Sequence, residues 1–164
     1  MEHVVLIGPM ASGKSSIGKH LAEILGREYI DTDALIVAEH GPITQIFDQM
    51  GESTFRQLEE SAVAEAIGET RPAVISLGGG AVISPRNREL LEDQTVILLM
   101  TDLETVLARA NLDKRPLLRD DPEAWNRILE ERMPLYEAAA DVTFDTGKLP
   151  RDVLARRIAD WLRR

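Results

Sequence analysis

A glycine-rich motif near the start of the 164-residue chain constrains its fold most strongly. Residues 8–15 read GPMASGKS and match the pattern G-x-x-x-x-G-K-[ST]. The motif lies between an apolar run at 4–7, which predicts a buried strand, and a segment at 14–25 whose apolar residues recur at helical spacing. A glycine-rich turn in this position directs backbone N–H groups and the positive end of a helix at a phosphate. The motif therefore predicts a nucleotide-binding site.

Specific residues of this motif have expected roles. We expect Lys14 to reach the β- and γ-phosphates of ATP and Ser15 to bind Mg²⁺. The remaining residues that we expect to contact ATP are Gly8, Ala11, Ser12, Gly13 and Ser16. The alternative is a glycine-rich turn between strand and helix with an exposed lysine. The motif does not reveal what happens to the γ-phosphate.

Strand-like and helix-like segments alternate along the rest of the chain. Short β-rich runs predict strands at 29–31, 73–77, 95–100 and 142–144. Longer periodic segments predict helices at 34–39, 43–50, 53–67, 85–92 and 103–110, then one around 125–133 that Pro134 interrupts, and one at 153–162. This alternation predicts an α/β fold with three layers, α/β/α, around a doubly wound parallel sheet of about five strands. Its ligand site is expected at the carboxyl ends of the strands.

One domain and one loop follow from the same reading. No linker rich in Pro, Gly or Ser divides the chain, so we expect a single domain over 1–164. The polar segment at about 111–123 contains Pro116 and Pro122 and predicts a mobile lid. Arg115 could close with this lid over the transferring phosphoryl group, or it could be a solvated loop charge.

Composition excludes several classes of protein. The chain has 19 Lys and Arg against 28 Asp and Glu, a formal net charge of −9, which is the opposite of a sequence-independent nucleic-acid binder. It has no cysteine, which rules out disulfide scaffolds and thiol nucleophiles. Its apolar runs are far shorter than the ~20 residues of a membrane helix. We expect a cytoplasmic monomer that binds neither nucleic acid nor membrane.

Two aspartates follow the second predicted strand. Asp31 and Asp33 are two residues apart, which in an extended chain puts both carboxylates on one face, beside the phosphate loop. One could act through Mg²⁺ and its waters while the other holds an acceptor hydroxyl and takes its proton. Alternatively, Asp33 only supports the start of the following helix.

Further candidates lie on the next elements. Gly78, Gly79 and Gly80 follow the third predicted strand and indicate a close approach to the backbone or N–H groups facing an anion, or else a flexible connection. Arg56 and Arg132 border apolar helical faces, where arginines often form structural ion pairs. Two guanidinium groups are also suited to a carboxylate ligand.

Taken together, these positions resemble the shikimate kinase family over essentially the whole chain. The phosphate loop is generic, but the combined set is specific. The family pattern is matched by Asp31-Thr32-Asp33, by I-x-x-I-F at 43–47, by Gly51-Glu52, by Phe55-Arg56 with Glu59, by the glycines at 78–80, by Arg-Pro-Leu-Leu at 115–118 and by Arg132-x-x-Leu-Tyr136.

The resemblance implies a fold, a reaction and a set of roles. The fold would be that of P-loop NTPases and nucleoside-monophosphate kinases, with a helical acceptor-binding segment at about 32–62. The reaction would transfer the γ-phosphoryl group of ATP to the 3-hydroxyl of shikimate. The implied catalytic residues are Lys14, Asp33 and Arg115. The implied acceptor ligands are Asp33, Arg56, Glu59, Gly78, Gly79, Gly80 and Arg132, with Glu59 orienting Arg56. Mg²⁺ would be held by Ser15 and, through water, Asp31. Arg109 and Arg115 would complete the ATP site, with Arg109 against the adenine.

Two rival functions stay open at this point. One is a kinase of similar build for another small hydroxylated acid such as gluconate. The other is a nucleotide-binding module that uses ATP as a switch and transfers nothing to a small molecule. A panel of acceptors distinguishes the three.

Overall fold

The computed structural model describes residues 2–109 and 119–164. Its five strands form one sheet in the order β2-β3-β1-β4-β5, and all neighbouring strands are parallel. The elements are β1 Val4–Ile7, α1 Lys14–Leu25, β2 Glu28–Asp31, α2 Thr32–His40, α3 Ile43–Met50, α4 Glu52–Ile67, β3 Ala73–Ser76, η1 Ala81–Ile83, α5 Pro85–Leu91, β4 Thr95–Met100, α6 Leu103–Arg109, α8 Pro122–Ala139, β5 Val142–Asp145 and α9 Arg151–Leu162.

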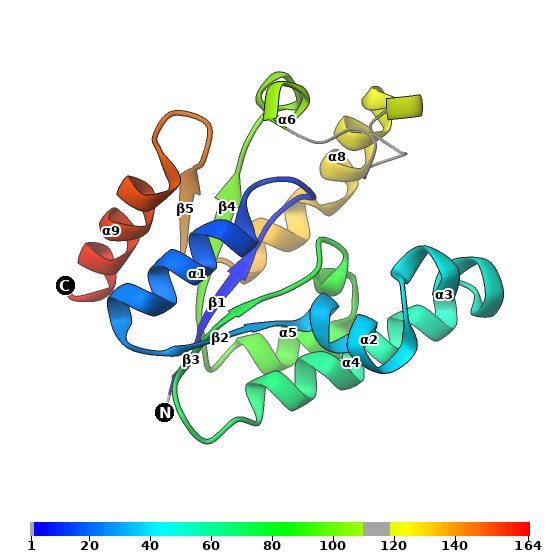
Figure 1. Cartoon of the computed structure of the whole chain (residues 1–164), viewed down its shortest axis with the longest axis horizontal. Helices are drawn as coiled ribbons and strands as arrows, with labels where there is room; N and C mark the ends of the chain where they lie inside the picture. Colours follow the sequence, from blue (N-terminus) through cyan, green and yellow to red (C-terminus); the bar gives the residue numbers. More distant parts are fainter. Residues whose placement is uncertain (1, 110–118) are drawn as a thin grey trace.

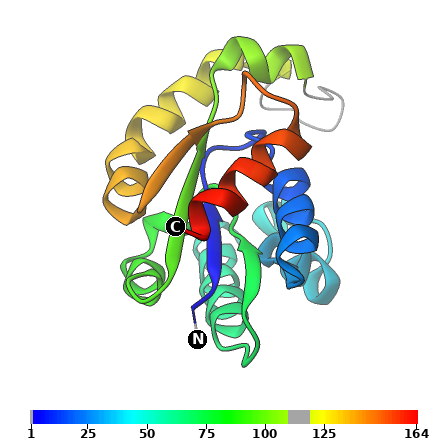
Figure 2. The same cartoon turned by 90° about the vertical axis from the view of Figure 1, so that its left-hand side faces the viewer.

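The central strand β1 shows why the fold has three layers. All four of its residues are buried, and their side chains alternate between two apolar clusters. Val5 and Ile7 face the cluster that includes α4, α5 and α8, whereas Val4 and Leu6 face α1 and α9. Helices therefore cover both faces of the sheet (Figures 1 and 2). The predicted doubly wound α/β/α architecture is confirmed.

Helices α2 and α3 extend the fold to one side. They pack with α4 around a small apolar cluster of their own, built on Ile36, Ile46 and Phe55. In Figure 1 they project beyond the sheet edge that ends in β2. This places the first half of α4, with Arg56 and Glu59, next to the carboxyl ends of β2 and β3.

The prediction that Pro134 interrupts a helix was wrong. Helix α8 runs from Pro122 to Ala139 with Pro134 inside it. Proline cannot donate to the carbonyl of Glu130, four residues earlier, which removes one helical hydrogen bond. The buried side chains of Trp125 and Tyr136, on either side of Pro134, anchor both halves of the helix in the core.

The predicted lid loop at 111–123 was also too long. Residues 119–120 are helical, and α8 already begins at Pro122. Proline at the first helical position is favourable because its missing N–H would have no partner there. Pro122, which the sequence predicts to lie in the loop, therefore begins a helix.

The end of the sheet opposite to the carboxyl ends is tied together by a buried histidine. His3 is 2% exposed, its Nδ1 accepts from the Ala73 N–H at 3.1 Å, and its Nε2 lies 3.0 Å from the Ile67 carbonyl. The backbone N–H of His3 donates to Gln94 Oε1 at 2.7 Å.

Within the described part of the chain, no helix has the length and apolar character needed to cross a bilayer.

Candidate active site

The phosphate loop leaves the central strand at the carboxyl edge of the sheet. Gly8 and Gly13 have φ angles of 145° and 91°, and Ala11 has φ 65°. A Cβ on Gly8 would collide with the carbonyl oxygen of Leu99 on the neighbouring strand. Ala11 adopts a conformation that disfavours side chains, at a cost of about 1–2 kcal/mol. The loop backbone is thus held in a turn that only the glycines enter freely.

Lys14 and Ser15 begin α1 at the end of this loop. The Lys14 ammonium donates to the carbonyls of Gly8 and Pro9 at 2.7 and 2.9 Å and so lies across the loop. The Ser15 hydroxyl donates to Asp31 Oδ2 at 3.2 Å. Ser15 and Asp31, which the sequence predicts to hold the same Mg²⁺ ion, are therefore neighbours.

The two aspartates do not lie on one face of an extended strand as predicted. Asp31 ends β2, and its Oδ1 accepts from the N–H groups of Asp33 and Ala34 at 2.9 and 3.2 Å. Asp31 is therefore the N-cap of α2, and Asp33 lies in the first helical turn. The alternative, that Asp33 supports the start of the helix, agrees with its place in the first turn, while the side-chain cap itself comes from Asp31.

This arrangement leaves Asp33 facing the interior of the site. Its Oδ1 is buried and has no hydrogen-bond partner among the described residues. Burial raises the pKa of the Asp33 carboxyl above its ordinary value, and the Asp31 charge raises it further. The positive charges of Lys14 and Arg56 lower this pKa in turn. Asp33 is thus a carboxylate with an unused acceptor atom and increased affinity for a proton, features that suit a proton acceptor.

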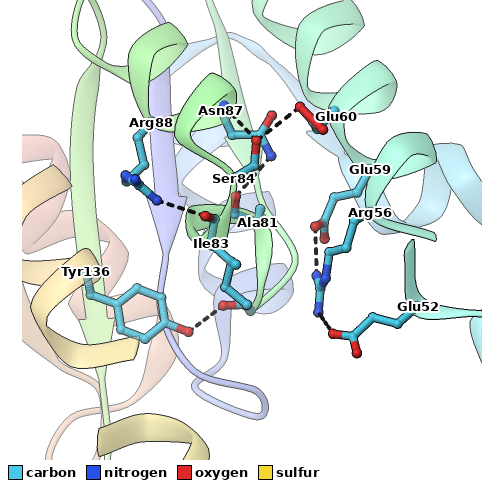
Figure 3. A network of polar contacts seen from close by, with 11 residues as sticks. Glu52, Arg56, Glu59, Glu60, Ala81, Ile83, Ser84, Asn87, Arg88 and Tyr136 are labelled. Atoms are coloured by element: carbon cyan, nitrogen blue, oxygen red, sulfur yellow. Dashed lines mark hydrogen bonds and ion pairs between the residues drawn. The ribbon is translucent and has the colours of Figure 1, made fainter. Parts of the chain in front are cut away.

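Arg56 and the buried Glu59 form an ion pair on α4 (Figure 3). Arg56 Nη1 lies 2.8 Å from Glu59 Oε1, and Arg56 Nη2 lies 3.6 Å from the exposed Glu52. The Arg56 Nε is buried and unpartnered in the described structure, so the ion pair does not use the whole guanidinium. Burial raises the pKa of Glu59, although Arg56 lowers it. Glu59 holds the arginine while leaving donors for a ligand.

The three glycines after β3 each face one of the predicted acceptor residues. A Cβ on Gly78 would lie 2.6 Å from Asp33 Oδ1, and one on Gly80 would lie 2.5 Å from Arg56 Nη1. A Cβ on Gly79 would lie 3.4 Å from Arg132 Nη1. Three charged side chains therefore lie directly against the glycine segment.

Ser76 is the last residue of β3. It is 2% exposed, and its hydroxyl donates to the Lys14 carbonyl at 3.3 Å. Ser76 pairs with Asp31 in the sheet register and so lies next to the strand end that carries the aspartates. Its hydroxyl supports the first turn of α1.

A cavity of about 660 Å³ brings the candidate residues together. Its lining includes, of the predicted site residues, Ala11, Ser12, Gly13, Lys14, Ser15, Ser16, Asp31, Asp33, Arg56, Glu59, Gly78, Gly79, Gly80, Arg109 and Arg132. Gly8, which the sequence predicts to contact ATP, is not among the lining residues. The predicted roles of Arg115 and of the Arg-Pro-Leu-Leu segment lie outside the described residues.

Helix α8 joins the two ends of this cavity. The Trp125 indole N–H donates to the Met10 carbonyl in the phosphate loop at 2.8 Å. The Tyr136 hydroxyl donates to the Gly79 carbonyl in the glycine segment at 2.5 Å. Arg132 lies between these anchors and reaches the cavity.

Sequence reasoning missed some lining residues. Arg151, at the start of α9, lines the cavity, and a Cβ on Gly13 would lie 3.5 Å from its Nε. Phe47 and Phe55 form an apolar wall with ring centroids 4.7 Å apart. The family pattern contained both phenylalanines, but no motif marked Arg151.

Arg109 donates to the carbonyls of Thr146 and Gly147 at 2.9 and 3.3 Å, which fixes it at the cavity edge.

Comparison with known proteins decides the family. A family model described as shikimate kinase matches residues 10–163. The chain belongs to the shikimate kinase family. It is 42% identical to a shikimate kinase of Vibrio cholerae over 98% of this chain and 94% of that protein. It is 46% identical to a shikimate kinase of Halorhodospira halophila, with coverage of 97% and 92%.

A solved structure of the family has the same fold. The structure of shikimate kinase from Acinetobacter baumannii in complex with shikimate matches with a TM-score of 0.90 and 38% identity. The match covers 99% of this chain and 93% of that one. The resemblance seen in the sequence motifs is confirmed, and the chain is an ATP-dependent kinase of this family.

Proposed function

We propose that this member of the shikimate kinase family transfers the γ-phosphoryl group of ATP to the 3-hydroxyl of shikimate. The products are ADP and shikimate 3-phosphate, an intermediate on the way to chorismate and the aromatic amino acids. One observation carries the proposal: a single cavity has a phosphate loop at one end and two arginines with a buried carboxylate at the other. Such a cavity fits a nucleotide and an acidic, hydroxylated acceptor side by side.

The nucleotide end would hold the phosphates with backbone N–H groups of residues 8–13 and with Lys14. Ser15 and Asp31 offer two neighbouring oxygen atoms, the type of ligand that Mg²⁺ prefers. The described residues hold no cluster of three or more His, Cys, Asp or Glu side chains suited to a metal. Phosphate and water oxygens would therefore complete the coordination. When bound, Mg²⁺ neutralises charge on the β- and γ-phosphates.

At the acceptor end, Arg56 and Arg132 would bind the carboxylate of shikimate with paired N–H groups. Asp33 would align the 3-hydroxyl. As that oxygen bonds to the γ-phosphorus, the bond to the ADP oxygen breaks and the hydroxyl proton passes to the Asp33 carboxylate. Phosphoryl transfer has a loose transition state, so alignment and charge neutralisation contribute more than the strength of the base. Lys14, with Arg115 in the predicted lid, would stabilise the phosphoryl group in transfer.

The experiment that tests this function measures ADP release from Mg·ATP with shikimate, with gluconate and with no acceptor. We expect rapid release with shikimate alone. Release with gluconate alone would keep the phosphate loop and contradict the acceptor assignments. No stimulation by either acid would favour a nucleotide-binding module.

Replacing Arg132 with lysine should raise KM for shikimate by about 10-fold, because a point charge replaces a bidentate guanidinium. KM for ATP should change little, since Arg132 lies at the acceptor end. Initial rates with each substrate varied in turn measure both constants.

Arg127 on the same helix offers a matched control. It is exposed and pairs with Asp121 at 2.6 Å, away from the cavity. Arg127→Lys should leave both KM values unchanged. An unchanged KM for shikimate in Arg132→Lys would indicate that Arg132 serves only as a structural ion-pair partner.

The acceptor-binding role of residues 32–62, the single-domain organisation, the monomeric state and the cytoplasmic location stay predictions from the sequence. Size-exclusion chromatography with light scattering tests the monomer directly. A dimer in solution would contradict it.

A further inference from the structure

The segment that follows β3 is held in place by side chains from other elements (Figure 3). Four of its carbonyl oxygens accept from side chains: Gly79 from Tyr136 at 2.5 Å, Ala81 from Asn87 at 2.9 Å, and Val82 and Ile83 from Arg88 at 2.7 and 2.9 Å. The donor to Gly79 comes from α8, and the donors to the other three come from α5. Of these four carbonyls, only that of Gly79 is held by α8, the helix that carries Arg132.

The Gly79 carbonyl differs from the other three in its position. Gly79 and Gly80 line the cavity, whereas Ala81, Val82 and Ile83 are not among its described lining residues. Tyr136 is 1% exposed and packs in the apolar cluster between the sheet and α8, so its hydroxyl reaches Gly79 from the core side. The Gly79–Gly80 peptide therefore separates a buried tyrosine from the acceptor end of the cavity.

The planarity of the peptide fixes what faces the cavity. The Gly79 carbonyl and the Gly80 N–H belong to one peptide unit, and no peptide bond in the described chain is cis. In a trans peptide the C=O and N–H point in opposite directions. Because the carbonyl points to Tyr136, the Gly80 N–H points away from Tyr136, which does not line the cavity, whereas Gly80 does.

A hydrogen bond to a carbonyl also makes the N–H of the same peptide a stronger donor, by about 10–30% in condensed phases. The Tyr136 hydroxyl therefore both orients the peptide and makes the Gly80 N–H a better donor. The guanidinium of Arg56 lies directly against Gly80, so two donors converge at this point of the cavity. An oxygen atom of an acceptor would be held between them.

We propose that Tyr136 is a positioning residue for the acceptor, acting through the Gly79–Gly80 peptide to present the Gly80 N–H to an acceptor oxygen. The proposal rests on the proposed function for the identity of the acceptor. Tyr136 does not line the cavity. Its hydroxyl also lies beside Arg132, so the Gly80 amide signal is needed to separate an effect through the peptide from one through Arg132.

The test replaces Tyr136 with phenylalanine, which removes one oxygen and keeps the buried ring. We expect KM for shikimate to rise about 5- to 10-fold, in line with one lost hydrogen bond, with KM for ATP within about 2-fold of the wild type. The control is Arg88→Met, which frees the carbonyls of Val82 and Ile83 on the same segment but away from the cavity. It should leave both KM values unchanged.

A second measurement needs no substrate. In the free protein, the amide ¹⁵N–¹H signal of Gly80 should shift in Tyr136→Phe, because its peptide carbonyl has lost a donor, and should stay in place in Arg88→Met. The remaining amide signals report whether each variant is folded.

The outcomes separate the two proposals. If shikimate does not stimulate ADP release by the wild-type protein, the proposed function is contradicted. The Gly80 amide signal still decides whether Tyr136 controls this peptide. An active wild type whose Tyr136→Phe variant keeps its KM for shikimate overturns the inference alone. Equal increases in both KM values, or in both variants, would also overturn it, because they indicate a general loosening of the segment.

Discussion

Replacing Asp33 with asparagine is expected to lower kcat by about 10²- to 10⁴-fold, the usual contribution of a positioned proton acceptor. Asparagine keeps the shape of the side chain, but its neutral amide aligns the acceptor hydroxyl less well than a carboxylate and cannot take its proton. The affinity for ATP should stay near that of the wild type, because Asp33 lies at the acceptor end of the cavity. Steady-state turnover and nucleotide binding by calorimetry measure the two effects. Near-normal turnover would refute the role of Asp33.

The same variant should be more stable than the wild type at neutral pH. Burial raises the pKa of Asp33 in the folded protein above its unfolded value of about 3.9. A carboxyl with a raised folded pKa loses stability as the pH rises from the unfolded pKa through the folded pKa. The wild type therefore carries a cost at pH 7 that asparagine removes, and this advantage should disappear near about pH 3.

Thermal unfolding of both proteins at each pH measures this effect. Asp48→Asn is the matched control, since Asp48 is exposed on the neighbouring helix α3. It should change neither turnover nor the pH dependence of Tm. A lower Tm for Asp33→Asn at pH 7 would show that the carboxylate stabilises the fold and would contradict the assigned electrostatics.

Replacing Gly80 with alanine should raise KM for shikimate by about 10²-fold without unfolding the protein. The new methyl group would lie 2.5 to 2.8 Å from three guanidinium atoms of Arg56, so the side chain must move. Because these atoms are the end of the flexible Arg56 side chain, it can move aside, and we expect the protein to stay folded. A displaced guanidinium loses charge-assisted hydrogen bonds worth about 1.5–3 kcal/mol, which sets the expected size of the effect.

Gly79→Ala provides the comparison within the same segment. Its Cβ would lie 3.4 Å from the nearest atom, Arg132 Nη1, which is an ordinary contact. We expect a KM for shikimate only a few-fold above that of the wild type, and a Tm close to that of Gly80→Ala. Equal effects of the two substitutions would show that the placement of Arg56 does not decide acceptor binding.

Much of the fold could be predicted because local and global signals agree. The strand at 4–7 and the helices at 14–25 and 43–50 have the predicted bounds. The apolar run of β1 is buried on both faces, and the glycine motif fixes where α1 begins. Of the 22 described residues that line the cavity, 15 are predicted site residues.

The errors have a physical origin in tertiary structure. The D-T-D motif was read as extended, but Asp31 caps a helix through its side chain, and the same pattern fits both conformations until the helix is seen. Pro134 was expected to interrupt α8, but the buried Trp125 and Tyr136 outweigh one lost hydrogen bond. Arg151 reaches the phosphate loop because α9 packs on α1, a long-range contact that no local pattern shows.

Helix α8 has a consequence for how the two halves of the site can evolve. Its contacts to Met10 and Gly79 come from residues 125 and 136, about 16 Å apart along the helix at 1.5 Å per residue. The helix thus acts as a spacer between the donor and acceptor sites. A substitution that shifts one anchor moves the other, so changes at the two ends should show epistasis even though they are remote in sequence and touch different substrates.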